Sequence, residues 1–439
     1  MDALEQRTVA KVGRRLLPLL MLGYFAAYLD RVNLGFAALQ MNKDLGFSAS
    51  VFGFGAGIFF LGYFVFEVPS NLALERFGAR KWIARIMLTW GVLSGAMAFV
   101  RGETGFYVIR VLLGAAEAGF FPGIVFYLTL WFPSAYRARV MGLFVIALPV
   151  SVIVGAPVSG LIYGLDGALG LRGWQWLFLI EAIPALILAV VTFFYLTDWP
   201  SEARWLTTEE RDWLIARLDA ERRQREAAQS LSVVQALYNP KVLALSAVYF
   251  GVSATSTGLS YFLPQIVRGF GVSYLQTTLI TAIPYVVGAV GMVACGRRSD
   301  RHLERRSHVA VALLLAAIGI GVSTILDQPV LKIAAFCLAG FGVYGALAIF
   351  WTLPTAVLSG PAAAAGLAVI NSLGNLAGFV GPYTIGVIKD ATGSYTGGLM
   401  AVSYTVVLGV IVLLGLHHDP ALERPPPERR DDRASEAVP

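Results

Sequence analysis

Residues 71–81 read NLALERFGARK, and residues 296–306, which lie 225 positions later, read GRRSDRHLERR. In both stretches an acidic residue and an arginine are followed, after three further positions, by two basic residues. The candidate gating residues in this cytoplasmic motif are Glu75, Arg76 and Arg80 in the first copy and Asp300, Arg301 and Arg305 in the second. Pro157 and Pro382 have the same separation. Because two unrelated features agree on one offset, we expect a duplicated unit with a central site between its two copies.

The chain is too apolar for a water-soluble protein. Of its 439 residues, 57% are hydrophobic and 14% are charged, with a mean hydropathy of +0.68, whereas soluble proteins carry roughly 25% charged residues. The charges separate apolar runs of about 18 to 27 residues, each long enough to cross a hydrocarbon layer of roughly 30 Å as a helix. The predicted spans are 15–39, 51–73, 82–99, 105–131, 138–163 and 174–197, then 242–267, 275–296, 308–326, 330–353, 362–388 and 397–417. The sequence therefore predicts an all-α membrane protein of twelve transmembrane helices in two pseudo-repeated six-helix halves.

The spans divide the chain into four parts. We expect an N-terminal half over 1–197, a cytoplasmic linker over 198–241, a C-terminal half over 242–418 and a disordered cytoplasmic tail over 419–439. The linker is highly charged, and Thr207 precedes an acidic turn and an amphipathic run, which predicts a surface helix. The tail is rich in proline and charge and cannot bury apolar surface.

Basic residues are distributed unevenly between alternate loops. If the N-terminus is cytoplasmic, 26 of the 34 lysine and arginine residues lie in cytoplasmic segments and six lie in the opposite loops. Cytoplasmic loops of membrane proteins carry such an excess, so both termini are predicted to be cytoplasmic. The asymmetry also explains the net charge of +6 without any binding of nucleic acid. We expect a multi-pass protein of the cell inner membrane.

The motifs resemble those of a known superfamily of transporters. The loop after the second span resembles the Gly-x3-Asp-Arg-x-Gly-Arg-Arg signature of the major facilitator superfamily, with Asn71 and Glu75 as departures, and the second copy is closer. Within that superfamily the chain is similar to the anion:cation symporter family over nearly its full length. The segments that carry this resemblance are YLDRVNLGFA (28–37), EVPSNLALERFGARKWIARI (67–86), RVLLGAAEAGFFPG (110–123), WLFLIEAIPA (176–185) and DWPSEARWLTTEER (198–211). The EVPSN segment is most similar to permeases for tartrate, phthalate and hydroxyphenylacetate, which implies a proton-coupled importer of an organic acid.

Asp30, Arg31, Arg110 and Glu117 lie well inside predicted spans, where a charge costs roughly 2.5 to 3.5 kcal/mol on insertion scales. Asp30 and Arg31 are adjacent in the first span and point about 100° apart around the helix. Arg110 and Glu117 lie on one face of the fourth span, two turns or about 10 Å apart. A guanidinium binds a carboxylate through two parallel donors, so the arginines are candidate ligands for an organic anion. The two carboxyls are candidate proton-coupling groups, because burial favours their neutral form and a nearby arginine favours the charged form.

Our hypothesis is that a proton on Glu117 frees an arginine to hold the substrate, while Asp30 reports protonation to the gate. The resemblance implies the same, since similar family members use the matching acidic positions for protons. The alternative is that the four residues form internal salt bridges that only hold the helices together. Glu67 and Glu181 are also within spans but are not included in the site, and a structural role is favoured for Glu181.

The C-terminal half has no charge at the positions equivalent to Asp30 and Arg31, since the 225-residue shift leads to Thr255 and Ser256. Its candidate substrate-binding residues are Tyr261, Asn371 and Asn375. The two asparagines are four residues apart, so they share a helix face and could donate to substrate oxygens. The resemblance favours Asn375, in the GNLAG stretch. Hydrogen bonding between helices is the alternative role.

Several function classes lack the residues that they require. The sequence contains no Walker-type GKS or GKT, which excludes a nucleotide-driven pump. The four histidines lie in loops or at a helix end, away from the membrane charges, and the two cysteines have no CxxC or histidine partner. We therefore expect no enzyme activity, no cofactor and no metal site.

These features predict a secondary transporter that imports a small organic anion with protons by alternating access. We expect a monomer in the lipid bilayer whose partners are the anion and the proton. An exporter or exchanger of organic anions on the same fold remains open, as do sodium coupling and a non-transporting membrane receptor.

Overall fold

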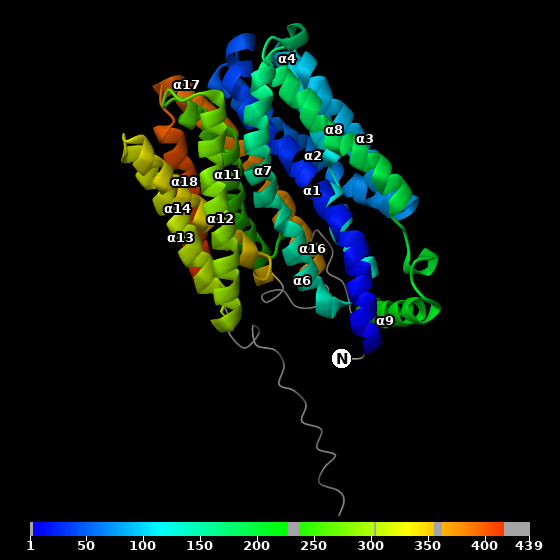
Figure 1. Ribbon diagram of the computed structural model, residues 1–439. Helices are drawn as coiled ribbons and strands as arrows, with labels where there is room; N and C mark the ends of the chain where they lie inside the picture. The colour runs from blue at the N-terminus through cyan, green and yellow to red at the C-terminus, as the bar shows by residue number, and fades with distance from the viewer. Residues whose placement is uncertain (1–2, 227–234, 236, 303, 355–361, 417–439) are drawn as a thin grey trace, which may run out of the picture.

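The computed structural model describes the whole chain except residues 1–2, 227–234, 236, 303, 355–361 and 417–439. Every regular element among the described residues is a helix (Figure 1). Ten helical runs of the described chain are long and apolar enough to cross a membrane. The other two predicted spans correspond to α1, which carries Asp30 and Arg31 in its middle, and to the consecutive helices α16 and α17. The twelve-span, all-α architecture is confirmed.

The first six spans form the N-terminal half. Its helices are α1 (Ala3–Leu45), α2 (Ala49–Phe77), α3 (Ala79–Ala96), α4 (Glu103–Glu117), α5 (Phe120–Trp131), α6 (Ser134–Val145), α7 (Ala147–Ile162) and α8 (Gly173–Tyr195). Short 3₁₀ turns are η1 (Met97–Phe99), η2 (Tyr163–Leu165), η3 (Ala168–Gly170) and η4 (Pro200–Glu202). The fourth and fifth predicted spans are each divided, into α4 with α5 and into α6 with α7.

The surface helix α9 (Thr208–Glu226) follows and leads to the C-terminal half. That half consists of α11 (Pro240–Arg268), α12 (Tyr274–His302), α13 (Arg306–Ile325), α14 (Pro329–Phe350), α16 (Ala362–Asn375), α17 (Ala377–Thr392) and α18 (Thr396–Gly415). The linker helix is therefore present where the charged segment predicted it. The predicted tail over 419–439, like part of the linker, lies outside the described residues.

The two copies of the charged motif each tie a helix turn to the end of a neighbouring span. Arg80 donates its backbone N–H to Asp198 Oδ1 at 2.7 Å, and its Nε lies 3.7 Å from Oδ2 of the same carboxylate. In the second copy Arg306 donates to the carbonyl oxygens of Leu413, at 3.1 Å, and Leu414. Residues 80 and 306 thus hold the ends of the sixth and twelfth spans.

The other motif residues differ in exposure. Glu75, Arg76 and Arg301 are exposed. Arg305 donates to Ser299 Oγ at 3.1 Å. The side chain of Asp300 lies outside the described part of the chain.

Among the described residues the two halves meet mainly where α2 packs on α17, α7 on α12 and α1 on α11, with a smaller contact of α2 with α16. Several close approaches between them lie at the distal end, defined as the end that carries loop residues 46–48 and 393–395 and lies away from the N-terminus in Figure 1. Here a Cβ at Gly53 would stand 2.4 Å from the carbonyl oxygen of Pro382, so only glycine permits this approach of α2 to α17. The rings of Tyr163 and Tyr274 stack with centroids 4.5 Å apart.

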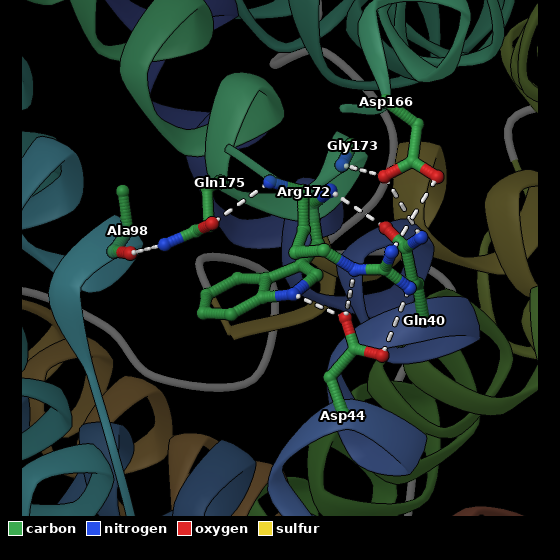
Figure 2. A network of polar contacts seen from close by, with 8 residues as sticks. Gln40, Asp44, Ala98, Asp166, Arg172, Gly173 and Gln175 are labelled. Carbon is green, nitrogen blue, oxygen red and sulfur yellow. Dashed lines mark hydrogen bonds and ion pairs between the residues drawn. The ribbon is translucent and has the colours of Figure 1, made fainter. Parts of the chain in front are cut away.

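A polar network fixes the distal end of the N-terminal half (Figure 2). Arg172 binds Asp44 through both Nε, at 2.8 Å, and Nη2, at 3.1 Å. Gln40 donates to Asp166 Oδ1 at 3.1 Å, and Gln175 donates to the carbonyl oxygen of Ala98 at 2.7 Å. These contacts join the end of α1 to the loop before α8, and α8 to η1, so the network lies entirely within one half.

At the opposite end, Glu210 connects α9 to α1. Its carboxylate is buried and accepts from Lys11 Nζ at 2.8 Å and from the backbone N–H of Thr207 at 2.9 Å. The Thr207 hydroxyl accepts in return from the Glu210 N–H at 3.2 Å, which completes a capping box. Because these donors favour the charged carboxylate, with Lys11 contributing most, the pKa of Glu210 is held below its ordinary value.

A Glu210→Gln variant is therefore expected to melt roughly 2 °C below the natural protein at pH 7. A carboxyl whose pKa is lowered in the folded state stabilises the fold above its unfolded pKa of about 4.3, and this stability is lost as the pH falls through the folded pKa. The difference between the two proteins should thus shrink between about pH 5 and pH 3. Thermal unfolding of purified protein measures it, with Glu209→Gln as control because that side chain is 70% exposed. If the difference in melting temperature were the same at pH 7 as at about pH 3, the role of the carboxylate would be contradicted.

Candidate functional site

The fourth predicted span breaks immediately after Glu117, where α4 ends. Ala118 has an extended ψ of 134°, and Gly119 has a positive φ of 84° before α5 begins. A Cβ at Gly119 would also stand 2.3 Å from Ser70 Oγ, so glycine is required by both conformation and packing. Glu117 therefore occupies the inner end of a discontinuous helix, and transporters commonly bind solutes at such breaks.

Arg31 and Glu117 form an ion pair between α1 and α4. The Nε of Arg31 donates to Glu117 Oε1 at 2.8 Å, and Nη2 lies 2.6 Å from the same oxygen. The Glu117 side chain is 3% exposed, whereas 22% of the Arg31 side chain is exposed. A guanidinium has five N–H donors, so Arg31 retains donors for a carboxylate ligand while it is paired.

Aromatic residues surround the Arg31 guanidinium. Its Cζ lies 5.3 Å from the ring centroids of both Phe59 and Tyr63 on α2. Tyr24 on α1 and Tyr249 on α11 are also among its electrostatic neighbours. Tyr24, Tyr63 and Tyr249 were not predicted as site residues, because aromatic residues in membrane helices usually serve packing. Their hydroxyls give the site neutral hydrogen-bonding groups beside its cation.

Arg110, the second predicted ligand, is only 1% exposed. It donates from Nε to the carbonyl oxygen of Gly55 at 3.1 Å and from Nη2 to that of Ala56 at 3.0 Å. Its Cζ lies 4.7 Å from the Phe59 ring centroid, and the predicted ligand Tyr261 lies beside it. In this conformation Arg110 thus holds α4 against α2 and faces the junction with α11.

Asp30 points away from its neighbour Arg31 and toward α3. It accepts hydrogen bonds from Trp90 Nε1 at 2.6 Å, Ser94 Oγ at 2.8 Å and Asn33 Nδ2 at 3.3 Å. The carboxylate is 4% exposed. The structure therefore separates the two candidate proton-coupling groups into different environments, one bound to an arginine and one bound to neutral donors.

Asn371 of α16 contacts Glu67 of α2, which was not predicted as a site residue. Its Nδ2 donates to Glu67 Oε1 at 2.9 Å, and Ser372 Oγ donates to Oε2 at 3.3 Å. Glu67 is buried. Because α2 belongs to the N-terminal half and α16 to the C-terminal half, this contact links the two halves. Asn375 is half-buried at the end of α16.

Phe59, Tyr63 and Glu67 form a stripe along α2 because they are spaced four residues apart. The stripe leads from Arg31 to Asn371 in the other half. This spacing was a signal in the sequence that could have identified Glu67 and Tyr63 as neighbours of the site.

Asp390 forms a bond between the halves at the distal end. This residue of α17 accepts from the backbone N–H groups of Ala49, at 3.0 Å, and Ser50, at 2.7 Å, in the first turn of α2. The N-terminus of a helix has unpaired N–H donors and a positive end charge, so a carboxylate stabilises it. Because the carboxylate comes from the other half, the bond is made only while the distal end is closed.

An Asp390→Ala variant is expected to open its distal end about fivefold more often, since loss of a helix cap costs about 1 kcal/mol. Phe52 is fully buried against α11 in the closed state. The measurement is the rate at which a maleimide labels a Phe52→Cys variant in a background that lacks Cys295 and Cys337. Asp44→Ala is the matched control, because Asp44 lies at the same end but bonds within one half. Equal labelling rates in both variants would contradict the gate.

Matches to known proteins agree with this architecture. Residues 20–382 match the Major Facilitator Superfamily. The chain is 53% identical over 411 residues to a protein named "Putative tartrate transporter" from Agrobacterium vitis, covering 94% of this chain and 91% of that protein. It is 41% identical over 409 residues to a "Quinolone resistance transporter" from Acinetobacter baumannii, covering 93% of this chain and 94% of that protein.

Solved structures show the same fold. The partially occluded inward open form of the xylose transporter XylE from E. coli has a TM-score of 0.71 and 15% identity, with 91% of this chain and 97% of that chain covered. The protein is therefore a multi-pass membrane transporter of a small molecule and not an enzyme, and it belongs to the major facilitator superfamily.

Proposed function

We propose that the protein imports a small organic anion together with protons by alternating access. The observation that carries this proposal is the pair of a partly exposed Arg31 and a buried Glu117 at the break after α4. A proton on Glu117 removes the charge that holds Arg31, and the guanidinium is then free to bind a carboxylate through two parallel donors. When that carboxylate leaves, Arg31 again favours the ionised form of Glu117 and releases the proton.

The surroundings of Arg31 favour a hydroxylated carboxylate as substrate. Tyr24, Tyr63 and Tyr249 place phenol groups near the guanidinium, and a phenol can both donate to and accept from a substrate hydroxyl. The 53%-identical relative named for tartrate supports a hydroxy acid of this kind. Arg110, Tyr261, Asn371 and Asn375 complete the proposed substrate path, and Asp30 relays protonation to α3.

We further propose that both termini face the cytoplasm and that this conformation is closed at its distal end. The excess of basic residues in alternate loops supports cytoplasmic termini in a cell inner membrane. With that orientation the closed distal end faces outward. This conformation is then the inward-facing one, in which the substrate reaches its site from the cytoplasm. The Arg80–Asp198 contact and the bonds of Arg306 to α18 then act as hinges on the cytoplasmic side. We take the transporting unit to be one chain.

Export of an organic anion is the second candidate function. The 41%-identical relative named for quinolone resistance favours this direction. The same Arg31–Glu117 pair serves either direction, because gradients and relative affinities set the net flux of a secondary transporter.

Uptake by proteoliposomes tests both functions. Purified protein would be assayed with radiolabelled tartrate, phthalate and a neutral sugar under an imposed proton gradient, an imposed sodium gradient, or none. Accumulation of one acid that requires the proton gradient supports the proposal. Exchange of internal for external acid without such accumulation would refute proton-driven import and favour an exporter or exchanger, and accumulation that requires sodium would refute proton coupling.

A further inference from the structure

A further buried carboxyl group, Glu181 of α8, has no part in the proposed mechanism. It is 2% exposed, and its Oε1 accepts a hydrogen bond from Ser159 Oγ of α7 at 2.6 Å. Its other oxygen, Oε2, is buried and has no hydrogen-bond partner among the described residues. No basic side chain in the described chain forms an ion pair with Glu181. An ionised carboxylate in this place would be both unpaired and undersolvated.

Asn33 links Glu181 to Asp30. The amide is fully buried, donates to Asp30 Oδ1 at 3.3 Å and lies beside Glu181. The amide oxygen of Asn33, like Oε2 of Glu181, has no hydrogen-bond partner among the described residues. Two carboxyl groups therefore share one amide, and two acceptor oxygens, Glu181 Oε2 and the amide's own Oδ1, have no donor among the described residues.

One proton satisfies this arrangement. Two buried carboxyls that are close to each other cannot both be ionised without a nearby cation, so the pair holds one proton. Asp30 accepts from three donors and is stabilised as the anion, whereas Glu181 has Ser159 as its one close donor and otherwise only the Asn33 amide that it shares with Asp30. Trp90 and Ser94 bind Asp30 alone, Ser159 binds Glu181 alone, and Asn33 is shared, so the surroundings assign the proton to Glu181 and the negative charge to Asp30.

The neighbouring elements contribute no charge that changes this assignment. From η2, the Tyr163 hydroxyl lies near Glu181 but donates to the carbonyl oxygen of Phe36 at 2.6 Å. From α3, Trp90 and Ser94 are neutral donors to Asp30, and α7 presents Ser159. From α4, Arg110 and Glu117 act on Asp30 at longer range with opposite signs.

We propose that Glu181 and Asp30, joined by Asn33, form a second proton-binding site that holds one proton on Glu181 in this conformation. Its role in coupling rests on the proposed function, but its occupancy by a proton does not. The site lies next to the interface of the two halves, because Ser159 precedes Gly160, where a Cβ would stand 2.2 Å from Thr278 Oγ1 of α12. Loss of the proton would leave an unpaired charge against α7, at the point where α7 meets the other half.

Infrared difference spectroscopy tests the occupancy directly. Natural protein at pH 7 in lipid nanodiscs is expected to show a protonated carboxyl C=O band that Glu181→Gln removes. Ser159→Ala should keep this band and move it to higher frequency, because the hydrogen bond to Oε1 is lost. A spectrum unchanged by Glu181→Gln would overturn the proposal. So would a band that disappears when sodium chloride replaces choline chloride at constant pH, since the site would then bind a metal cation.

The ratio of protons to substrate tests the role in coupling. In proteoliposomes, the reversal potential for tartrate or whichever acid is transported should indicate one proton fewer per anion in Glu181→Gln, with exchange retained. An unchanged ratio would overturn the coupling role. The infrared result is read without any transport, so failure of the proposed function would leave the band intact and is distinguishable from failure of this site.

Discussion

An Arg31→Lys variant is expected to bind its organic anion about 10- to 100-fold more weakly than the natural protein. Hydrogen bonds to charged groups contribute about 1.5 to 3 kcal/mol, and an ammonium cannot reproduce the two parallel donors of a guanidinium. Arg31 is the one cation of the candidate set with an exposed fraction, 22%, that permits contact with a ligand in this conformation. The dissociation constant for tartrate, or for the acid that proteoliposomes accumulate, measures the effect by titration calorimetry.

The matched control is Arg172→Lys. Arg172 also binds a carboxylate, Asp44, through two nitrogens at 2.8 and 3.1 Å, but it lies in the distal network of one half. The control makes the same chemical change and should leave the dissociation constant within about threefold. Equal weakening by both substitutions would indicate a loss of structure rather than of a ligand contact, and the site would be wrongly placed.

The fold could be predicted because membrane crossing depends on properties that a single segment carries. An apolar run of sufficient length must form a helix across the bilayer, whatever its neighbours are. The same reasoning located Asp30, Arg31, Arg110 and Glu117, since charges at that depth require partners or a ligand. The divided spans were not predicted, because a break such as the one at Gly119 depends on a single positive φ inside an otherwise apolar run.

The pairing of the charges depends on contacts between helices, which spacing along one helix does not determine. Arg110 and Glu117 were expected to share a face of one span, yet the ion pair is between Glu117 and Arg31 of another helix. Likewise Asp390 and Glu67 acquire their partners only when the two halves come together. Such contacts belong to one conformation of a moving molecule, so the sequence names the candidates but not their partners.

A Glu117→Gln variant is expected to lose proton-driven accumulation while it retains exchange. Glutamine has the shape of glutamic acid and cannot ionise, so Arg31 remains available to the substrate in every state. Accumulation of the anion under an imposed proton gradient should fall to the level of empty liposomes. Exchange between internal and external substrate should remain within about threefold of the natural rate, because binding and alternating access need no change of protonation. Parallel assays of net uptake and of exchange on the same proteoliposomes measure both quantities.

The Glu210→Gln variant supplies the control, because it makes the same substitution at a partly buried ion pair between α9 and α1, outside the site. It should retain accumulation, apart from the small loss of stability expected above. If Glu117→Gln lost both accumulation and exchange, Glu117 would be needed to hold Arg31 in place, and the internal salt bridge would be structural. If Glu117→Gln kept full accumulation, the proton would have to enter elsewhere, and the Asp30–Glu181 pair would become the principal site. Only the loss of accumulation with exchange intact would show that Glu117 binds the coupled proton, which frees Arg31 to bind the carboxylate of the substrate.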